Sequence, residues 1–227
     1  MVQSLYENNM TIVSGKIVTE PTFSHEVYGE GFYSFYINVK RLSDSYDKIP
    51  VLVSERLTVY SELKVGAGVR VEGQFRSYNA VANVSNKLLL MIFAREIEIF
   101  ENIEDMKNEN SIALNGFVCK KPIYRTTPFG REIADILLAV NRTYNKSDYI
   151  PCISWGRNAK YCSKFNVGDN VKVWGRIQSR EYQKKFHDGT VENRVAYEIS
   201  VSKLELERIE EKENDAVNTM NISDEEG

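Results

Sequence analysis

The sequence predicts an all-β protein that consists of two similar barrel-shaped units of five strands each. The 227-residue chain is rich in β-branched and aromatic residues and has only 5 prolines, a composition that favours strands over helices. In addition, the order of turn residues and apolar positions in the first hundred residues recurs in the second hundred, as in a duplicated unit. The length suits two units of about 100 residues each.

The duplication is visible at a shift of 101 residues, increasing to 102 further along. NMTIVSGKIVTEP, starting at Asn9, matches NSIALNGFVCKKP, starting at Asn110. VGAGVRVEGQFRS, from Val65, matches VGDNVKVWGRIQS, from Val167. AREIEIFE near the end of the first copy resembles SVSKLELE near the end of the second. We therefore expect a first domain over residues 1–101 and a second over residues 110–207.

Each copy shows the alternation of apolar and polar residues that is typical of strands. Strands are predicted over residues 9–18, 32–40 and 69–76 in the first copy, and over residues 111–119, 134–141, 149–155, 170–180 and 195–207 in the second. Between the third and fourth strands of the second copy, Ala159, Cys162 and Phe165 have the spacing of one short helix. Five strands with a helix after the third is the order of an OB-fold. We expect two tandem OB-fold barrels, each with at most one short helix.

Charge is distributed unevenly along the chain. Residues 111–207 contain 16 Lys and Arg against 10 Asp and Glu, a net charge of +6, whereas residues 9–101 have a net charge of -1. The polar segment 102–109 is predicted to be an acidic linker. Residues 208–227, with a net charge of -5 and no aromatic residue, are predicted to form a disordered acidic tail. We expect such a tail to compete with phosphate for the basic second copy.

Several functional classes lack their characteristic residues. The three cysteines have no CxxC spacing and the only histidines are His25 and His187, so no disulfide framework, metal site or cofactor is expected. Asp135 and Asp148 are single carboxylates, and no catalytic residue is assigned. No signal peptide or membrane span is recognised. The expectation is a non-enzymatic, cytoplasmic, nucleoid-associated protein.

The second copy resembles the bacterial single-stranded DNA-binding proteins of replication, recombination and repair. The resemblance is carried by LNGFVCKKPIYRTTPFG, DILLAVNR, DYIPCISWGRNAKYCSKFNVGDNVKVWGRIQSREY and VAYEISVSKLEL. It implies that bases stack on aromatic side chains at the matching positions, which are Tyr144, Tyr149, Trp155 and Tyr182. The strand pattern adds Trp174, opposite in parity to Val171 and Val173. The inserted hairpin KKFHDGT adds Phe186, with Asp188-Gly189 as its turn.

The first copy departs from this pattern. The positions that correspond to the four aromatics are Ser43, Lys48, Ser54 and about Ala80, and none of them is aromatic. We therefore expect the second copy to do most of the binding. The end of the chain, NISDEEG, also lacks the apolar Pro-Phe tip that the family uses to dock on partner proteins.

Stacking explains why such a surface tolerates any sequence, because every base has a π-face. Phosphates require cations along the same path, and binding then weakens as salt rises. The expected phosphate contacts are the basic residues nearest to these aromatics or on the same strands: Arg142, Lys146, Arg157, Lys172, Arg176, Arg180, Lys184, Lys185 and Arg194.

The leading interpretation is sequence-independent binding and protection of single-stranded DNA. The alternative is a replication or primosome accessory module of the same fold that recruits proteins and binds DNA weakly. A nuclease is a third possibility, but it requires clustered acids or a histidine pair that the sequence does not supply. Expected partners are single-stranded DNA, replication or repair proteins, and a second copy of the chain, whose dimer has four barrels. No membrane partner is expected.

Overall fold

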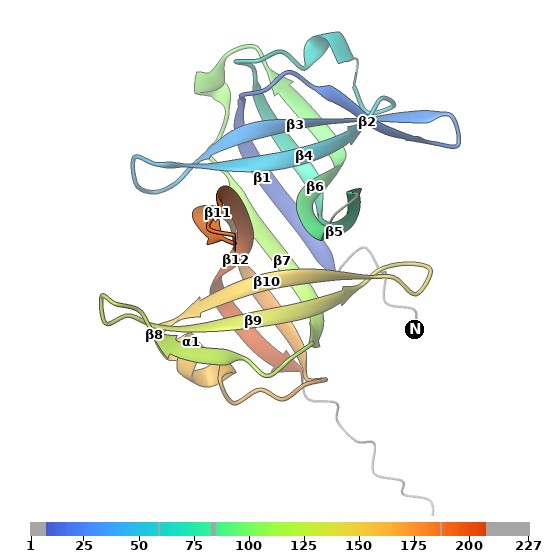
Figure 1. The fold of residues 1–227 in the computed structure, drawn as a ribbon. Coiled ribbons are helices and arrows are strands. Elements are labelled where there is room, and N and C mark those ends of the chain that lie inside the picture. Colours follow the sequence, from blue (N-terminus) through green and yellow to red (C-terminus); the bar gives the residue numbers. More distant parts are fainter. Residues whose placement is uncertain (1–7, 59, 83–84, 187, 208–227) are drawn as a thin grey trace, which may run out of the picture.

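The structure, a computed structural model, describes residues 8–58, 60–82, 85–186 and 188–207, and these are mostly β-strand (Figure 1). The acidic tail predicted for residues 208–227 lies outside the described residues. The first half contains six strands and one 3-10 helix: β1 (Asn9–Ile17), β2 (Thr22–Val27), β3 (Glu30–Lys40), β4 (Tyr46–Ser54), η1 (Tyr60–Glu62), β5 (Gly68–Ala82) and β6 (Ser85–Phe100).

The second half repeats this order and has an α-helix where the first half has η1. Between the halves, η2 (Ile103–Asp105) lies in the predicted linker. The elements that follow are β7 (Asn110–Val118), β8 (Ile123–Thr126), β9 (Glu132–Asn141), β10 (Ser147–Trp155), α1 (Gly156–Cys162), β11 (Asn170–Lys185) and β12 (Val191–Glu207). The predicted tandem OB-fold is confirmed. The sequence pattern did not indicate the short strands β2 and β8, and in the first half it gave no range for β4 or β6.

Within each half the strands curl around an apolar core. In the first half, β5 pairs with both β1 and β6, β6 pairs in parallel with β4, and β3 returns to β1. The second half repeats these pairings. Alternate residues of the strands point inward, as the two-residue period requires. Phe35 and Phe75 fill the first core, and Leu138, Ile177 and Ile199 fill the second.

The helix of the second half forms as its apolar spacing predicted. Gly156 has φ +53°, a left-handed conformation that suits glycine, and it lets the chain turn directly from β10 into α1. Ala159 and Cys162 are buried on the inner side of α1, and Phe165 is buried just after its end. No helix among the described residues is long and apolar enough to cross a bilayer.

The two halves are joined into one twelve-stranded sheet through an antiparallel pair, β1 and β7 (Figure 1). In this pair Thr11 lies opposite Ile112, and these two residues occupy the same position in the sequence repeat. The same symmetry relates Ser14 N–H bonding to the Glu109 carbonyl and Asn115 N–H bonding to the Asn8 carbonyl, both at 2.8 Å. The duplication in sequence therefore becomes a pseudo-twofold relation between the halves.

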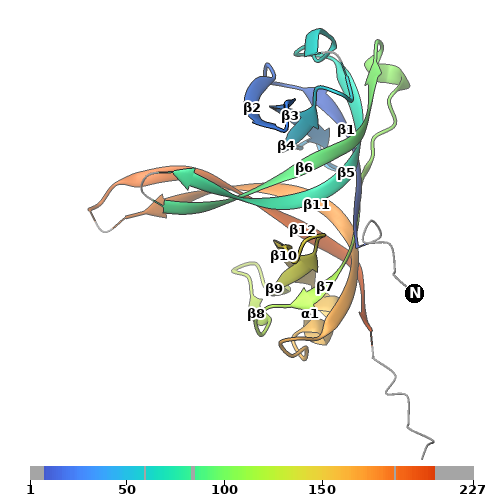
Figure 2. The ribbon, with the colours of Figure 1, turned by 90° about the vertical axis from the view of Figure 1, so that its right-hand side faces the viewer.

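Two long hairpins, β5–β6 and β11–β12, project from the same side of the molecule between the two halves (Figure 2). The sequence predicted that their first strands end at residues 76 and 180, but β5 continues to Ala82 and β11 to Lys185. Residues 180–185 are exposed on both faces of β11. Such a segment has no buried face, so apolar alternation could not mark it as a strand.

Candidate nucleic-acid interface

The fourth strand of the second half, β11, carries many of the predicted site residues on one face. Val171, Val173 and Ile177 point into the core and are fully buried. Because side chains alternate along a strand, the even-numbered positions of β11 and Phe186, just beyond its end, lie on the outer side. We call this surface the β11 face, and it is formed by Lys172, Trp174, Arg176, Arg180, Tyr182, Lys184 and Phe186.

Each aromatic ring on the β11 face has a cation within about 6 Å, the range in which a cation is attracted to a ring. The ammonium of Lys203 lies 4.6 Å from the centroid of the Trp174 ring, and the guanidinium of Arg180 lies 5.8 Å from that of Tyr182. The Phe186 ring has two cations near it, Lys184 at 5.0 Å and Arg194 at 5.6 Å from its centroid. Arg194 lies opposite Tyr182 in the β11–β12 register. The face therefore combines flat apolar surfaces with positive charge.

The other three predicted stacking residues lie on or beside β10. Tyr144, in the turn between β9 and β10, has φ +61° and is 93% exposed. Tyr149 is 47% exposed on β10, and Trp155, the last residue of β10, is 37% exposed. In the sheet, β12 lies between β10 and β11. The structure thus places the predicted aromatics in two groups, separated by one strand.

The predicted phosphate contacts differ in whether a carboxylate already holds them. Four are paired: Lys172 with Glu207, Arg180 with Glu198 at 4.0 Å, Arg194 with Glu192 at 2.6 Å and Arg142 with Asp148 at 3.1 Å. The bond from Lys172 lowers the pKa of Glu207. The other five make no ion pair with any described residue: Lys146, Arg157, Arg176, Lys184 and Lys185. These five cations are available to a bound anion.

Arg142 has a structural role that the sequence interpretation did not foresee. Its guanidinium lies 3.1 Å from the buried carboxylate of Asp148 and donates to the Ser77 carbonyl at 3.4 Å. Asp148 also accepts from the Ser77 N–H at 2.6 Å and from the Ser77 hydroxyl at 3.1 Å. Burial raises the pKa of Asp148, against the opposing effect of these donors and of Arg142. Arg142 therefore connects the second half to the first, and its contact with phosphate stays a prediction.

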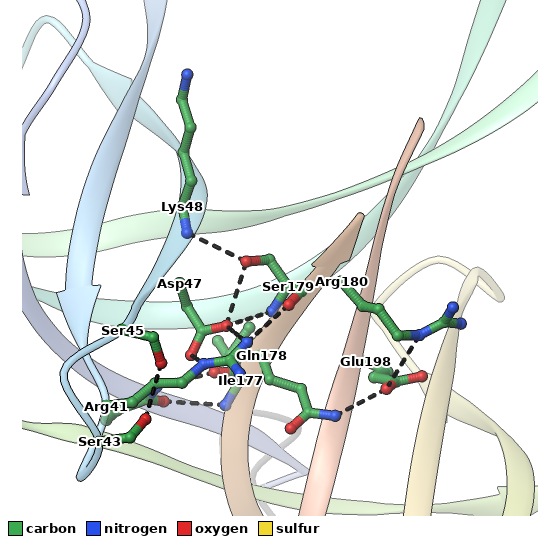
Figure 3. Close-up of polar contacts among 11 residues, drawn as sticks. Arg41, Ser43, Ser45, Asp47, Lys48, Ile177, Gln178, Ser179, Arg180 and Glu198 are labelled. Atoms are coloured by element: carbon green, nitrogen blue, oxygen red, sulfur yellow. Dashed lines mark hydrogen bonds and ion pairs between the residues drawn. The ribbon is translucent and has the colours of Figure 1, made fainter. Parts of the chain in front are cut away.

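The pseudo-twofold generates a second cluster of the same composition (Figure 3). Asp47 accepts from the N–H of Ser179 at 2.6 Å and from its hydroxyl at 3.2 Å. Arg41 donates to Asp47 at 2.9 Å and to the Ser179 carbonyl at 2.8 Å. We call the two Arg-Asp-Ser clusters the reciprocal clamps. Each fixes the hairpin of one half against the loop and strand of the other.

The sequence contained a signal for these clamps. Arg41 and Arg142, Asp47 and Asp148, and Ser77 and Ser179 are identical pairs at the shifts of the repeat. Asp148 was instead interpreted as an isolated carboxylate. Because each carboxylate contacts a serine in the other half of the chain, the pairing could not be identified from either copy alone.

Residues 109–207 match the model of the Single-strand binding protein family. Single-stranded DNA-binding protein B of Bacillus subtilis is 36% identical over 86 residues, which cover 34% of this chain and 74% of that protein. The chain belongs to the single-strand binding protein family. Single-stranded DNA-binding protein A of B. subtilis is 32% identical over 108 residues, which cover 44% of this chain and 58% of that protein. Single-stranded DNA-binding protein 1 of Staphylococcus aureus (strain COL) is 37% identical over 83 residues, which cover 34% of this chain and 50% of that protein.

The matched part of this chain thus spans about half the length of several of these curated relatives. Among solved structures, the wild-type single-stranded DNA binding protein from Thermus aquaticus is similar, with a TM-score of 0.69. The comparison covers 88% of this chain and 93% of that one, at 19% sequence identity. At this identity the likeness concerns the fold, and it extends over both halves.

Proposed function

We propose that this protein binds single-stranded DNA without sequence preference and protects it during replication, recombination or repair. The proposal rests on one observation: the β11 face, where Trp174, Tyr182 and Phe186 alternate with cations along one side of a strand. An unpaired base that stacks on such a ring hides apolar area, and the contact is worth about 1–3 kcal/mol per base. Membership of the family supports the same conclusion.

In this proposal Tyr149, Trp155 and Tyr144 extend the stacking surface onto β10 and its turn. Lys146, Arg157, Arg176, Lys184 and Lys185 contact phosphates, since no described carboxylate holds them. Binding is passive, without nucleotide hydrolysis or strand cleavage. Labelled single strands incubated with the protein and Mg²⁺ are expected to keep their length, and shortening would contradict this part.

The test is a fluorescence titration against oligo-dT at several salt concentrations, followed by the emission of the two tryptophans in the wild-type protein and by the anisotropy of a labelled oligo-dT when variants are compared. The double variant Tyr149→Ala/Trp155→Ala is expected to weaken binding by well over tenfold, since two bases no longer have a ring to stack on. Tyr124→Ala is the matched control, because Tyr124 is an exposed aromatic of the same half on β8, at the far edge of the sheet. Retained affinity in the double variant would contradict the assignment.

A second candidate function is that of an accessory module that recruits replication or primosome proteins. It is favoured by Ser43, Lys48 and Ser54 in the first half, where the second half has aromatic residues. A pull-down with replication proteins in the presence of nuclease separates the two functions, because partners bridged only by DNA are then removed. Sedimentation of the purified chain tests the proposed dimer with four OB-folds.

A further inference from the structure

The two faces of the β11–β12 hairpin have different surroundings. Arg180 and Tyr182, which belong to the β11 face, point to one side of the hairpin. Ser179 points to the other side, and Tyr197 lies opposite it in the β11–β12 register. We call the side of Ser179 and Tyr197 the rear face. Figure 3 shows the Arg180 side chain turned away from Asp47, which holds Ser179. The first half therefore contacts the hairpin from behind, on the face that lacks the predicted stacking residues.

Ser179 is the residue of the rear face that the first half holds most completely. Its N–H and its hydroxyl donate to the buried carboxylate of Asp47, at 2.6 and 3.2 Å. Its carbonyl accepts from Arg41 at 2.8 Å, and its hydroxyl accepts from the backbone N–H of Lys48 at 3.2 Å. The first half thus bonds to the side chain and to both backbone groups of Ser179. The strand cannot turn about this residue without breaking several bonds.

A pair of tyrosines adds a further contact on the rear face. A hydrogen bond between the hydroxyls of Tyr36 and Tyr197 joins β3 to β12, and burial together with this contact raises the pKa of Tyr197. In the repeat, the position of Tyr36 is taken by Leu137 and that of Tyr197 by Leu90, which also lies opposite the serine of its clamp. The two reciprocal clamps therefore differ: both tyrosines belong to the clamp that holds the β11–β12 hairpin.

Beyond Ser179 the hairpin has no packed face to direct it. Residues 180–185 are exposed on both faces of β11, and a two-stranded ribbon without a packed face is at best marginally stable in water. Tyr182 lies about 10 Å further along, at the rise of an extended strand, and Phe186 follows the end of β11. The position of both rings therefore depends on how firmly the strand is held at Ser179.

We propose that the first half takes part in DNA binding as a support that positions the β11–β12 hairpin. Its positioning residues are Tyr36, Arg41 and Asp47, and the side chains that they place are Tyr182 and Phe186 on the opposite face. Asp47 is fully buried, so it acts through the hairpin and does not itself contact a strand. The inference rests on the proposed function and deepens it, because it gives a role to the half that lacks the stacking residues of the second.

A hairpin that is already fixed binds a strand more tightly than a mobile one, because ordering a mobile segment on binding costs conformational entropy. Loss of the hold on the rear face should therefore reduce the part of the affinity that comes from Tyr182 and Phe186. The part that comes from Tyr149 and Trp155 should remain, since these residues lie on β10, outside the hairpin. This difference separates positioning from a general effect on the fold.

The test is a double-mutant cycle between Asp47 and the two rings of the hairpin, followed by the anisotropy of labelled oligo-dT. Asp47→Ala alone is expected to weaken binding by about five- to tenfold, because the hairpin must then be ordered on binding. In a protein that already carries Tyr182→Ala/Phe186→Ala, adding Asp47→Ala is expected to change the affinity by less than about twofold. An equal loss in both backgrounds would overturn the proposal.

Asn9→Ala is the matched control for a loss of stability. The Asn9 amide bonds to the N–H and the carbonyl of Phe75 at 2.9 and 2.7 Å, at the base of the β5–β6 hairpin. Like Asp47→Ala, it removes buried hydrogen bonds, but it leaves the hold on Ser179 intact. Its affinity is expected to stay near that of the wild type. A loss as large as in Asp47→Ala would assign the effect to stability in general and overturn the positioning role.

Hydrogen exchange measures the hold directly, and Tyr36→Phe provides a milder variant. This substitution keeps the ring and removes only the hydroxyl that contacts Tyr197. In the protein without DNA, amide exchange over residues 180–186 is expected to quicken in Asp47→Ala and, to a smaller extent, in Tyr36→Phe, but not in Asn9→Ala. Unchanged exchange in both of the first two variants would mean that the first half does not hold the hairpin.

The results separate this inference from the proposed function. If the wild-type protein does not bind oligo-dT, the proposed function fails. If it binds, and Tyr149→Ala/Trp155→Ala weakens binding while Asp47→Ala does not, the proposed function stands and only the positioning role is wrong.

Discussion

Asp47 and Ser179 are 132 residues apart in the chain, yet the buried carboxylate of Asp47 accepts both the N–H and the hydroxyl of Ser179, at 2.6 and 3.2 Å. Asp148 and Ser77 repeat the arrangement across the pseudo-twofold, at 2.6 and 3.1 Å. In one clamp the carboxylate belongs to the first half and the serine to the second, and in the other clamp the reverse holds. Together with the β1–β7 pair, these bonds hold each hairpin against the neighbouring half. The same contacts therefore stabilise the fold and fix the position of the β11 face.

Asp47→Ala is expected to lower the free energy of unfolding by about 2–4 kcal/mol, because it leaves the Ser179 N–H and the Arg41 guanidinium without their buried acceptor. Ser179→Ala is expected to cost only about 1 kcal/mol, since the backbone N–H still bonds to Asp47. Urea denaturation of both single variants and of the double variant measures the coupling. Equal costs for the two single variants would contradict this account of the clamp.

The raised pKa of Asp148 predicts a specific dependence of stability on pH. Burial is the main cause of the shift. A carboxyl group with a higher pKa in the folded than in the unfolded protein takes up a proton on folding, so its contribution to stability falls as pH rises from its ordinary pKa of about 3.9 through the folded value. Asp148→Asn is neutral at every pH. The stability of this variant relative to wild type is therefore expected to increase with pH through that window.

Urea titrations of wild type and Asp148→Asn from acid to neutral pH measure this difference directly, because groups that titrate alike in both proteins cancel. A constant difference across the range would mean that Asp148 has the same pKa in the folded and unfolded chains. The control variant is Asp135→Asn, which also replaces a carboxylate with a neutral amide. Asp135 is half-buried and pairs with the exposed Arg125 at 2.8 Å.

The sequence predicted strands where apolar and polar residues alternate, but it gave no range for β4, in which residues 49–54 are all buried and do not alternate, or for β6. In β11, Val171, Val173 and Ile177 alternate with polar residues, and the strand was recognised. Gly73 and Gly175 lie at irregularities of the β5–β6 and β11–β12 registers, where a Cβ would come within 2.2 and 2.3 Å of carbonyl oxygens. Where both faces are exposed, as in residues 180–185, periodicity gave no signal and the strand was ended early.

The candidate site was only partly predictable, for a different reason. The resemblance to the bacterial single-stranded DNA-binding proteins indicated Tyr149, Trp155 and Tyr182, and all three are exposed. The contact of the Lys48 N–H with Ser179 joins the two halves, and it becomes visible only when the pseudo-twofold is known. Comparing the copies position by position showed where the first half has no aromatic, but it did not show that the exposed Tyr36 on β3 lies beside Lys48 on β4.

Lys184 and Lys185 are expected to contribute mainly through phosphate charge. Lys184→Gln/Lys185→Gln should reduce the slope of log affinity against log salt by about 0.7 for each phosphate of a single strand that the protein no longer neutralises. Lys160→Gln removes a positive charge elsewhere, but Lys160 is paired with Glu132 at 2.9 Å beside β8 and should leave the slope unchanged. Titrations with oligo-dT at several salt concentrations give the slopes. If each substituted lysine changed the slope by the same amount at the two sites, the salt dependence would reflect the overall charge of the protein and not contacts at Lys184 and Lys185.

Asn110 holds β11 beyond the point where its pairing with β7 ends. The pair ends at Gly175 opposite Ile112, and the Asn110 amide then accepts from the Ile177 N–H at 2.9 Å and donates to the Ile177 carbonyl at 2.8 Å. Asn9 makes the same two bonds to Phe75 in the first half, at 2.9 and 2.7 Å. At the base of each hairpin, the asparagine side chain thus makes the two hydrogen bonds that the backbone of one further paired residue would make.

Asn110→Ala is therefore expected to destabilise the protein by about 2–4 kcal/mol, since two backbone groups are left without their partner at once, and Asn9→Ala should cost a similar amount. Asn115→Ala, which removes one bond at 3.3 Å to the Glu207 side chain, should cost less than about 1 kcal/mol. Urea denaturation gives the three values, and hydrogen exchange is expected to quicken over residues 176–185 in Asn110→Ala alone. If Asn110→Ala costs no more than Asn115→Ala, the amide does not hold the hairpin, and the position of the β11 face relies on the reciprocal clamps.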